Sequence, residues 1–149
     1  MAKREISLRE RALAMLARRE HTRAEMTRKL APHCEFPEQI EQLLDALAAR
    51  GWLSETRFAE SRANVLARKF GSRKIEYDLR SRGVSLEVVE QTVDRALAQE
   101  LDNCRTAWGK KFGVLPQNAA ERGRQMRFLA GRGFSAEAVR SVLKAEDAD

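Results

Sequence analysis

The chain has 149 residues, with 28 lysines and arginines against 22 aspartates and glutamates, which gives a formal net charge of +6. A hydrophobic content of 43% supports a packed core and excludes disorder along the whole chain. The longest apolar run, residues 12–17, is far shorter than the roughly 20 residues of a membrane-spanning helix. The first residues do not lead into a signal-peptide core. We therefore expect a cytoplasmic protein with no membrane partner.

Helical patterns fill the first third of the chain. An apolar stripe over residues 8–16 predicts one helix. The capping-box pattern of Thr22 and Glu25 predicts the start of a second helix, in which the hydroxyl and the carboxylate satisfy free amides. Pro37 suits the first turn of a third helix, and Gly51 should end it.

The middle and last thirds repeat this three-helix pattern. Further caps are predicted at Ser54, Ser72, Ser85 and Asn118. The expected helices span residues 54–69, 72–83, 85–97, 98–112, 119–131 and 136–145. No segment alternates β-branched and polar residues over the length of a strand.

The repeats are visible in the sequence itself, at an offset near 50. Residues 16–19 resemble residues 66–69, and Arg82-Gly83 recurs as Arg132-Gly133. The sequence thus predicts an all-α fold, a tandem array of three three-helix repeats at 1–50, 51–97 and 98–149, the last with a short acidic tail. Units of this size bury too little surface to be stable alone, so they should pack together as an elongated and curved array.

Charge is spread evenly over the repeats, each of which carries a net +2. The basic residues concentrate on the first and second helices, and each first helix ends with a basic pair: Arg18-Arg19, Arg68-Lys69 and Lys110-Lys111. The third helices of the first two repeats are acidic, so they would meet DNA phosphates unfavourably as the reading helices of a helix-turn-helix protein. An extended surface that binds a large partner fits this pattern better than sequence-specific DNA recognition.

Sequence motifs for catalysis are lacking. His21 and His33 have no cysteine or carboxylate at familiar metal-ligand spacing. A metal site formed by His33, Cys34 and Cys104 is disfavoured because Cys104 lies far from the other two in the sequence. Phosphate-binding loops and nucleophile motifs are not found. We therefore expect no enzyme, no catalytic residue, no metal and no cofactor. A disulfide is not expected either, because the cysteines lie 70 positions apart in a reducing compartment.

The junction between the first two repeats is the most distinctive stretch. Gly51 should end one helix and Ser54 should start the next. Large apolar side chains at such a junction usually join neighbouring units. We therefore expect Trp52, Leu53 and Phe58 to pack the repeats against one another.

This junction resembles the RecX family, bacterial regulators of the RecA recombinase. The similarity covers residues 51–55 with Phe58-Ala59, and it continues through the basic stretches at 68–75 and 79–84. Ser54 replaces the acidic residue that is commoner in the family and remains a good cap. The resemblance implies a curved, right-handed array that lies in the groove of the RecA filament.

The resemblance also implies a function. Such a protein binds RecA and its filament on single-stranded DNA, and restrains strand exchange, ATP hydrolysis and coprotease activity by capping filament growth or promoting disassembly. We expect a monomer that also allows weak direct DNA binding. The predicted binding surface comprises Arg18, Arg19, Arg68, Lys69, Arg73, Lys74, Arg80, Arg82, Arg124, Arg127 and Arg132. Two alternatives stay open: a stand-alone, non-sequence-specific DNA-binding protein, and a scaffold for another acidic protein.

Overall fold

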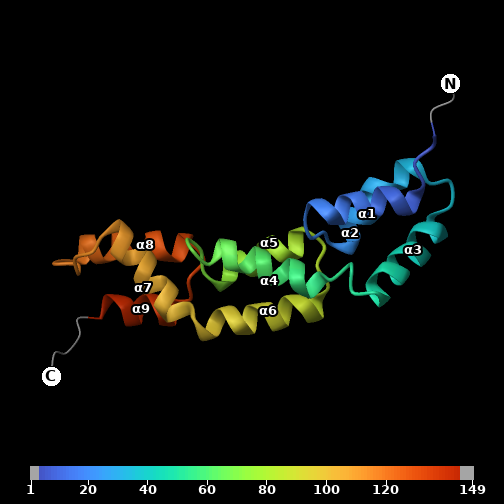
Figure 1. Cartoon of the computed structure of the whole chain (residues 1–149). Coiled ribbons are helices and arrows are strands. Elements are labelled where there is room, and N and C mark those ends of the chain that lie inside the picture. The colour runs from blue at the N-terminus through green and yellow to red at the C-terminus, as the bar shows by residue number, and fades with distance from the viewer. Residues whose placement is uncertain (1–3, 145–149) are drawn as a thin grey trace.

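Three helix triplets follow one another along an elongated, bent array (Figure 1). The computed structural model describes residues 4–144, and all regular elements in that range are helical. They are α1 (Leu8–Arg18), α2 (Arg23–Leu30), the short 3-10 helix η1 (Ala31–His33), α3 (Pro37–Ala49), α4 (Glu55–Leu66), α5 (Ser72–Ser81), α6 (Leu86–Ala98), α7 (Glu100–Lys111), α8 (Ala119–Gly131) and α9 (Ala136–Leu143). The prediction of an all-α tandem array is confirmed. The repeat limits at 50/51 and 97/98 stay a prediction, and the acidic tail at 145–149 lies outside the described residues.

Local capping explains where several helices begin. The side chains of Thr22, Ser54 and Asn118 accept hydrogen bonds of 2.9–3.2 Å from backbone N–H groups three residues on, as predicted. The second half of the predicted capping box at Thr22 is wrong, because the Glu25 carboxylate pairs with Arg19 instead.

Two further predicted caps differ from expectation. Ser72 occupies the first turn of α5, and Gly71 takes the cap position. Ser85 does cap α6 by position, but its side chain makes no capping hydrogen bond. Helix α4 also ends at Leu66, earlier than predicted. Residues 67–69 form turns, and the N–H groups of Lys69 and Phe70 both donate to the Leu66 carbonyl.

Glycines with a positive φ end one helix in each repeat: Gly51 follows the third helix of the first repeat, and Gly83 and Gly133 follow the second helices of the second and third repeats. Gly51, Gly83 and Gly133 have φ values of 76°, 80° and 91°. This left-handed backbone is strained for residues that carry a Cβ atom, so glycine gives a sharp helix end. The predicted stop at Gly51 is confirmed.

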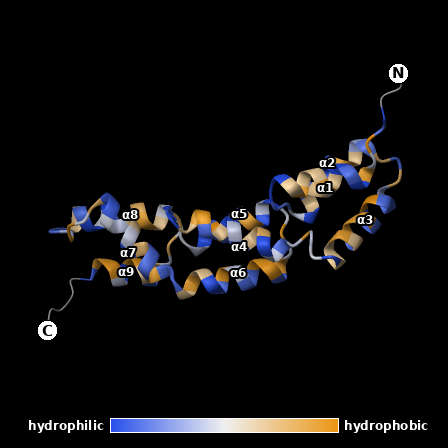
Figure 2. Ribbon diagram, viewed as in Figure 1, coloured by the Kyte–Doolittle hydropathy of each residue, from blue (hydrophilic) through white to orange (hydrophobic). Residues whose placement is uncertain are grey.

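Each repeat has its own hydrophobic core, and hydrophobic residues alternate with hydrophilic ones along the helices (Figure 2). Leu53 lies in the core of the first repeat, and Phe58 lies in the core of the second. Trp52 differs from the expectation that it packs repeats together, since 43% of the residue is exposed. The guanidinium groups of Arg9 and Arg50 cover its ring at 5.7 and 5.2 Å, where a neighbouring repeat was expected.

Polar contacts hold the longer first turn of the third repeat. The Trp108 indole N–H donates to Gln125 Oε1 at 2.8 Å, and Gln125 Nε2 donates to the Val114 carbonyl at 3.0 Å. Gln125 is buried, so both of its polar atoms need such partners. The inserted turn is thereby tied to α7 and α8.

Within residues 4–144, none of the helices combines the length and apolar character that a membrane span requires.

The two joints between repeats share one geometry. The start of the second helix in one repeat meets the Arg-Gly turn before the third helix of the next. At the first joint, the Thr22 hydroxyl donates to the Arg82 carbonyl at 3.3 Å. At the second joint, the Gly71 N–H donates to the Arg132 carbonyl at 2.9 Å, and the Arg73 N–H donates to Gly133 at 3.1 Å. At this contact the second joint thus has two backbone hydrogen bonds, where the first has one from a side-chain hydroxyl.

Candidate functional site

The predicted basic surface divides into separate groups. Arg18 borders a hollow between α1 and α2, while Arg19 and Arg82 border a groove at the first joint. A third group, with Arg68, Lys69 and Arg132, lines a cleft at the second joint. The remaining predicted cations occupy exposed positions of α5 and α8: Arg73, Lys74, Arg80, Arg124 and Arg127. Their role in binding stays a prediction.

Carboxylates pair with the arginines of the first joint. Arg62 donates from Nε and Nη2 to the two carboxylate oxygens of Asp78, both at 2.9 Å, and Arg82 Nε donates to Oδ1 at 2.9 Å. The hydrogen bonds from Arg62 lower the pKa of Asp78, although partial burial opposes them. Arg19 lies 2.9 Å from Glu25 without hydrogen-bond alignment. Arg82 and Arg19 are therefore already paired within the protein.

The cleft at the second joint keeps its positive charge. Five cations from the ends of three helices line it: Arg68, Lys69, Lys110, Lys111 and Arg132. Across residues 4–144, none of these five forms an ion pair with a carboxylate. The cleft encloses ≈ 210 Å³, and Ala107 and Phe128 complete its lining.

Aromatic rings hold part of this cluster in place. The Arg132 guanidinium lies 5.3 Å from the centroid of Phe70 and 5.0 Å from that of Phe128. Lys111 Nζ lies 5.5 Å from the Phe128 centroid, and Lys74 Nζ lies 5.5 Å from that of Phe70. Such contacts orient a cation without neutralising it.

The predicted surface leaves out Lys110 and Lys111, which the structure brings beside Arg68 and Lys69. The signal was present, because both basic pairs stand where the sequence predicts the end of the first helix of a repeat. It was weakened by the insertion at residues 114–117, which shifts the register between repeats. Neither Phe70 nor Phe128 carries a sequence signal that marks it as a support for cations.

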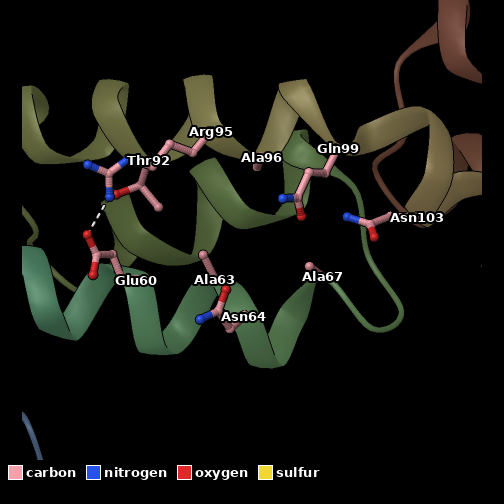
Figure 3. Close-up of a pocket in the computed structure, with 9 residues that line it drawn as sticks. All are labelled: Glu60, Ala63, Asn64, Ala67, Thr92, Arg95, Ala96, Gln99 and Asn103. Atoms are coloured by element: carbon pink, nitrogen blue, oxygen red, sulfur yellow. Dashed lines mark hydrogen bonds and ion pairs between the residues drawn. The ribbon is translucent and has the colours of Figure 1, made fainter.

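A further hollow lies between α4 and α6, and its lining is mostly small or uncharged (Figure 3). Glu60 and Arg95 face each other across it and form an ion pair. The hydroxyl of Thr92 donates to the Val88 carbonyl at 2.7 Å, so it is engaged within its own helix. The charged groups of this hollow satisfy each other, and its lining offers no nucleophile next to a general base.

The side chains of Cys104 and His21 lie in buried surroundings that shift their pKa values. Burial, followed by the nearby Glu100 charge, raises the pKa of the Cys104 thiol to about 11. Burial lowers the pKa of His21, whose Nδ1 lies 3.0 Å from the Arg19 carbonyl oxygen. In the part of the chain that the structure describes, no group of three or more His, Cys, Asp and Glu side chains is placed to hold a metal ion.

Family models match the chain in three consecutive segments. They describe the first, second and third three-helix domains of RecX, at residues 9–47, 54–93 and 98–143. The regulatory protein RecX of Leptothrix cholodnii is 45% identical over 143 residues, which covers 96% of this chain and 91% of that protein. The one from Chromobacterium violaceum is 44% identical over 137 residues and covers 92% and 89%.

Solved structures show the same fold. The crystal structure of RecX from Lactobacillus salivarius superposes with a TM-score of 0.80 at 16% identity and covers 92% of each chain. A crystal structure of a regulatory protein RecX gives a TM-score of 0.75 at 17% identity, over 92% of this chain and 71% of the other. At these identities the likeness concerns the arrangement of the helices.

Proposed function

The chain belongs to the RecX family, and on that premise we propose that it is a non-enzymatic cytoplasmic regulator that binds RecA and RecA filaments on single-stranded DNA. It acts mainly as an inhibitor of the recombinase, ATPase and coprotease activities of the filament. Through these activities it affects DNA repair and the SOS response. It works as a monomer.

One observation supports this proposal beyond family membership. Exposed cations occur in all three repeats of an elongated array, so the positive charge extends along the molecule. A RecA filament on DNA is a long polymer that contains phosphate groups, and an extended basic surface can contact it at several points at once. A compact basic domain would make only one such contact.

The proposal is tested by the DNA-dependent ATP hydrolysis of RecA. We expect strong inhibition when fewer than one molecule of this protein is present per RecA, because an effect on filament ends or filament structure spreads over many subunits. No inhibition at equal concentrations would contradict the proposal. Tight DNA binding without any effect on RecA would favour a stand-alone DNA-binding protein, and binding to neither would favour a scaffold for another acidic partner.

The predicted surface is tested by charge removal in the second repeat. A variant with Ala at Arg68, Lys69, Arg73 and Lys74 should inhibit RecA more weakly and with a smaller dependence on salt. The matched control replaces four exposed cations outside the predicted set: Arg28, Lys29, Arg105 and Arg140. Both variants should keep the helical circular dichroism of the wild type. Equal inhibition by the first variant and the wild type would overturn the assignment of this surface.

A further inference from the structure

The second and third repeats differ at one equivalent position, and that difference changes the charge beside the arginine at each joint. Asp78 and Phe128 both lie four residues before the arginine that ends the second helix of their repeat. Asp78 binds Arg82 at 2.9 Å and, because it also binds Arg62, offsets one of these two positive charges. Phe128 lies 5.0 Å from the Arg132 guanidinium and leaves its charge available.

Helix capping does not account for the whole cluster at the second joint. Lys110 and Lys111 lie in the last turn of α7, where a cation stabilises the carbonyl end of the helix. Arg68 and Lys69 lie beyond the end of α4, and Arg132 reaches the cleft between two aromatic rings. Five cations with like charge repel one another in one small cleft, which costs stability unless an anion binds there.

The chemistry of the lining selects the kind of anion. The side chains are lysines, arginines, alanine and phenylalanine, so they donate hydrogen bonds and accept none. A phosphodiester brings acceptors only and suits this lining. An acidic peptide would also bring backbone N–H groups, which would find no side-chain acceptor in the cleft.

We propose that this second-joint cleft binds the phosphodiester backbone of a single nucleic-acid strand. A volume of ≈ 210 Å³ admits one backbone, with the lysines as point charges and Arg132 as an oriented fork. A duplex holds its phosphates on a rigid cylinder, so we expect it to bind this cleft more weakly than a flexible single strand. The inference deepens the proposed function and rests on it for the identity of the strand, which would be the DNA of the filament.

Direct binding without RecA tests the cleft. A short fluorescein-labelled oligothymidylate is titrated with the full chain by fluorescence anisotropy at several salt concentrations. The double variant Lys110→Ala/Lys111→Ala should bind about tenfold more weakly, and its salt slope should fall by about 1.4, the value for two lost contacts to a single strand. The matched control Arg28→Ala/Lys29→Ala removes the same charge from α2 and should change affinity less than about threefold.

Other outcomes overturn the inference. Equal losses in the two double variants would show that only net charge matters. Tighter binding to a duplex of the same length would exclude the single-strand geometry. If labelled polyglutamate lost affinity in the lysine variant while the oligonucleotide did not, the cleft would be a site for an acidic protein. Thermal melting by circular dichroism checks that both variants fold, which the exposure of these lysines leads us to expect.

The test separates this inference from the proposed function. Lysine-dependent oligonucleotide binding with no effect on RecA hydrolysis would leave the cleft assigned and contradict the proposed function. Inhibition of RecA hydrolysis by a protein whose oligonucleotide binding ignores Lys110 and Lys111 would do the reverse.

Discussion

Glu100 Oε1 accepts two hydrogen bonds from Ser72, one from the backbone N–H and one from the hydroxyl, both at 2.8 Å. Glu100 is the first residue of α7 and Ser72 is the first residue of α5, so one carboxylate lies at the N-termini of two helices from different repeats. Both residues are buried. A negative charge at this point stabilises the positive ends of both helix dipoles and fastens the third repeat to the second.

Removal of this carboxylate should weaken the second joint. In the Glu100→Ala variant the Ser72 N–H and hydroxyl lose their acceptor while buried, so the free energy of unfolding should fall by about 2–3 kcal/mol. Urea denaturation followed by circular dichroism measures the loss, and a broader transition would indicate that the third repeat unfolds separately. The control Asp102→Ala removes an exposed acid from the same first turn of α7 and should cost at most about 0.5 kcal/mol. Equal losses in the two variants would contradict the capping role.

The second prediction concerns the close approach of two backbone segments at the second joint. A Cβ atom at Gly71 would lie 2.6 Å from the backbone of Gly133 and Phe134, so the Gly71→Ala variant should lose about 2–3 kcal/mol of unfolding free energy. Gly109, inside α7, has open space around its Cβ position. Gly109→Ala should therefore stabilise the protein by about 0.5–1 kcal/mol. Chemical denaturation of both variants measures these changes in unfolding free energy. A Gly71→Ala protein as stable as the wild type would show that the joint is looser than its contacts imply.

Local sequence predicts the helices well because their start and stop signals lie within a few residues of each other. The cap at Ser54 and the stop at Gly51 belong to this class. Ser72 does not, because its partner Glu100 is 28 positions away in another repeat. Tertiary contacts overrode the local preference of a serine for the cap position, and nothing near Ser72 in the sequence reveals this.

The candidate site was predictable only in part, for a related reason. Sequence shows where cations are, and the prediction included Arg82 and Arg132 on equal terms. Whether the charge of each arginine is available to a ligand depends on the residue one helical turn earlier, which is Asp78 in one repeat and Phe128 in the other. The contact of Trp52 with Arg9 likewise joins residues 43 positions apart, so no local pattern reveals it.

The two thiols should differ in reactivity. Cys104 is fully buried, and its pKa of about 11 leaves roughly one thiolate in a thousand at pH 8. Cys34 is only half-buried. A disulfide reagent such as Ellman's should therefore label Cys34 at least about 100-fold faster than Cys104 in the native protein, and both equally in urea. The Cys34→Ser variant should lose the fast phase. A fast phase that persists in this variant would show that the third repeat opens readily.

Stability should fall in mildly acidic solution because of His21. This side chain is buried and its pKa is lowered below 6.5, first by desolvation; the hydrogen bond to the Arg19 backbone and the Glu25 charge oppose the shift, and the charges of Arg19 and Lys29 add to it. The folded protein therefore holds His21 neutral, while the unfolded chain takes up a proton below pH 6.5. The stabilisation is present above that pH and is lost as the pH falls, by up to about 1 kcal/mol between pH 7.5 and 5.5.

The variant His21→Asn tests this assignment, since its amide can still donate to the Arg19 carbonyl but does not titrate in this range. Urea denaturation of wild type and variant at the two pH values should show a smaller pH dependence in the variant. Asp78 does not interfere, because Arg62 holds its pKa below 3.8 and it titrates in a more acidic range. An identical pH dependence in the two proteins would mean that another group carries the effect, since a burial that keeps His21 neutral must appear as a proton taken up on unfolding.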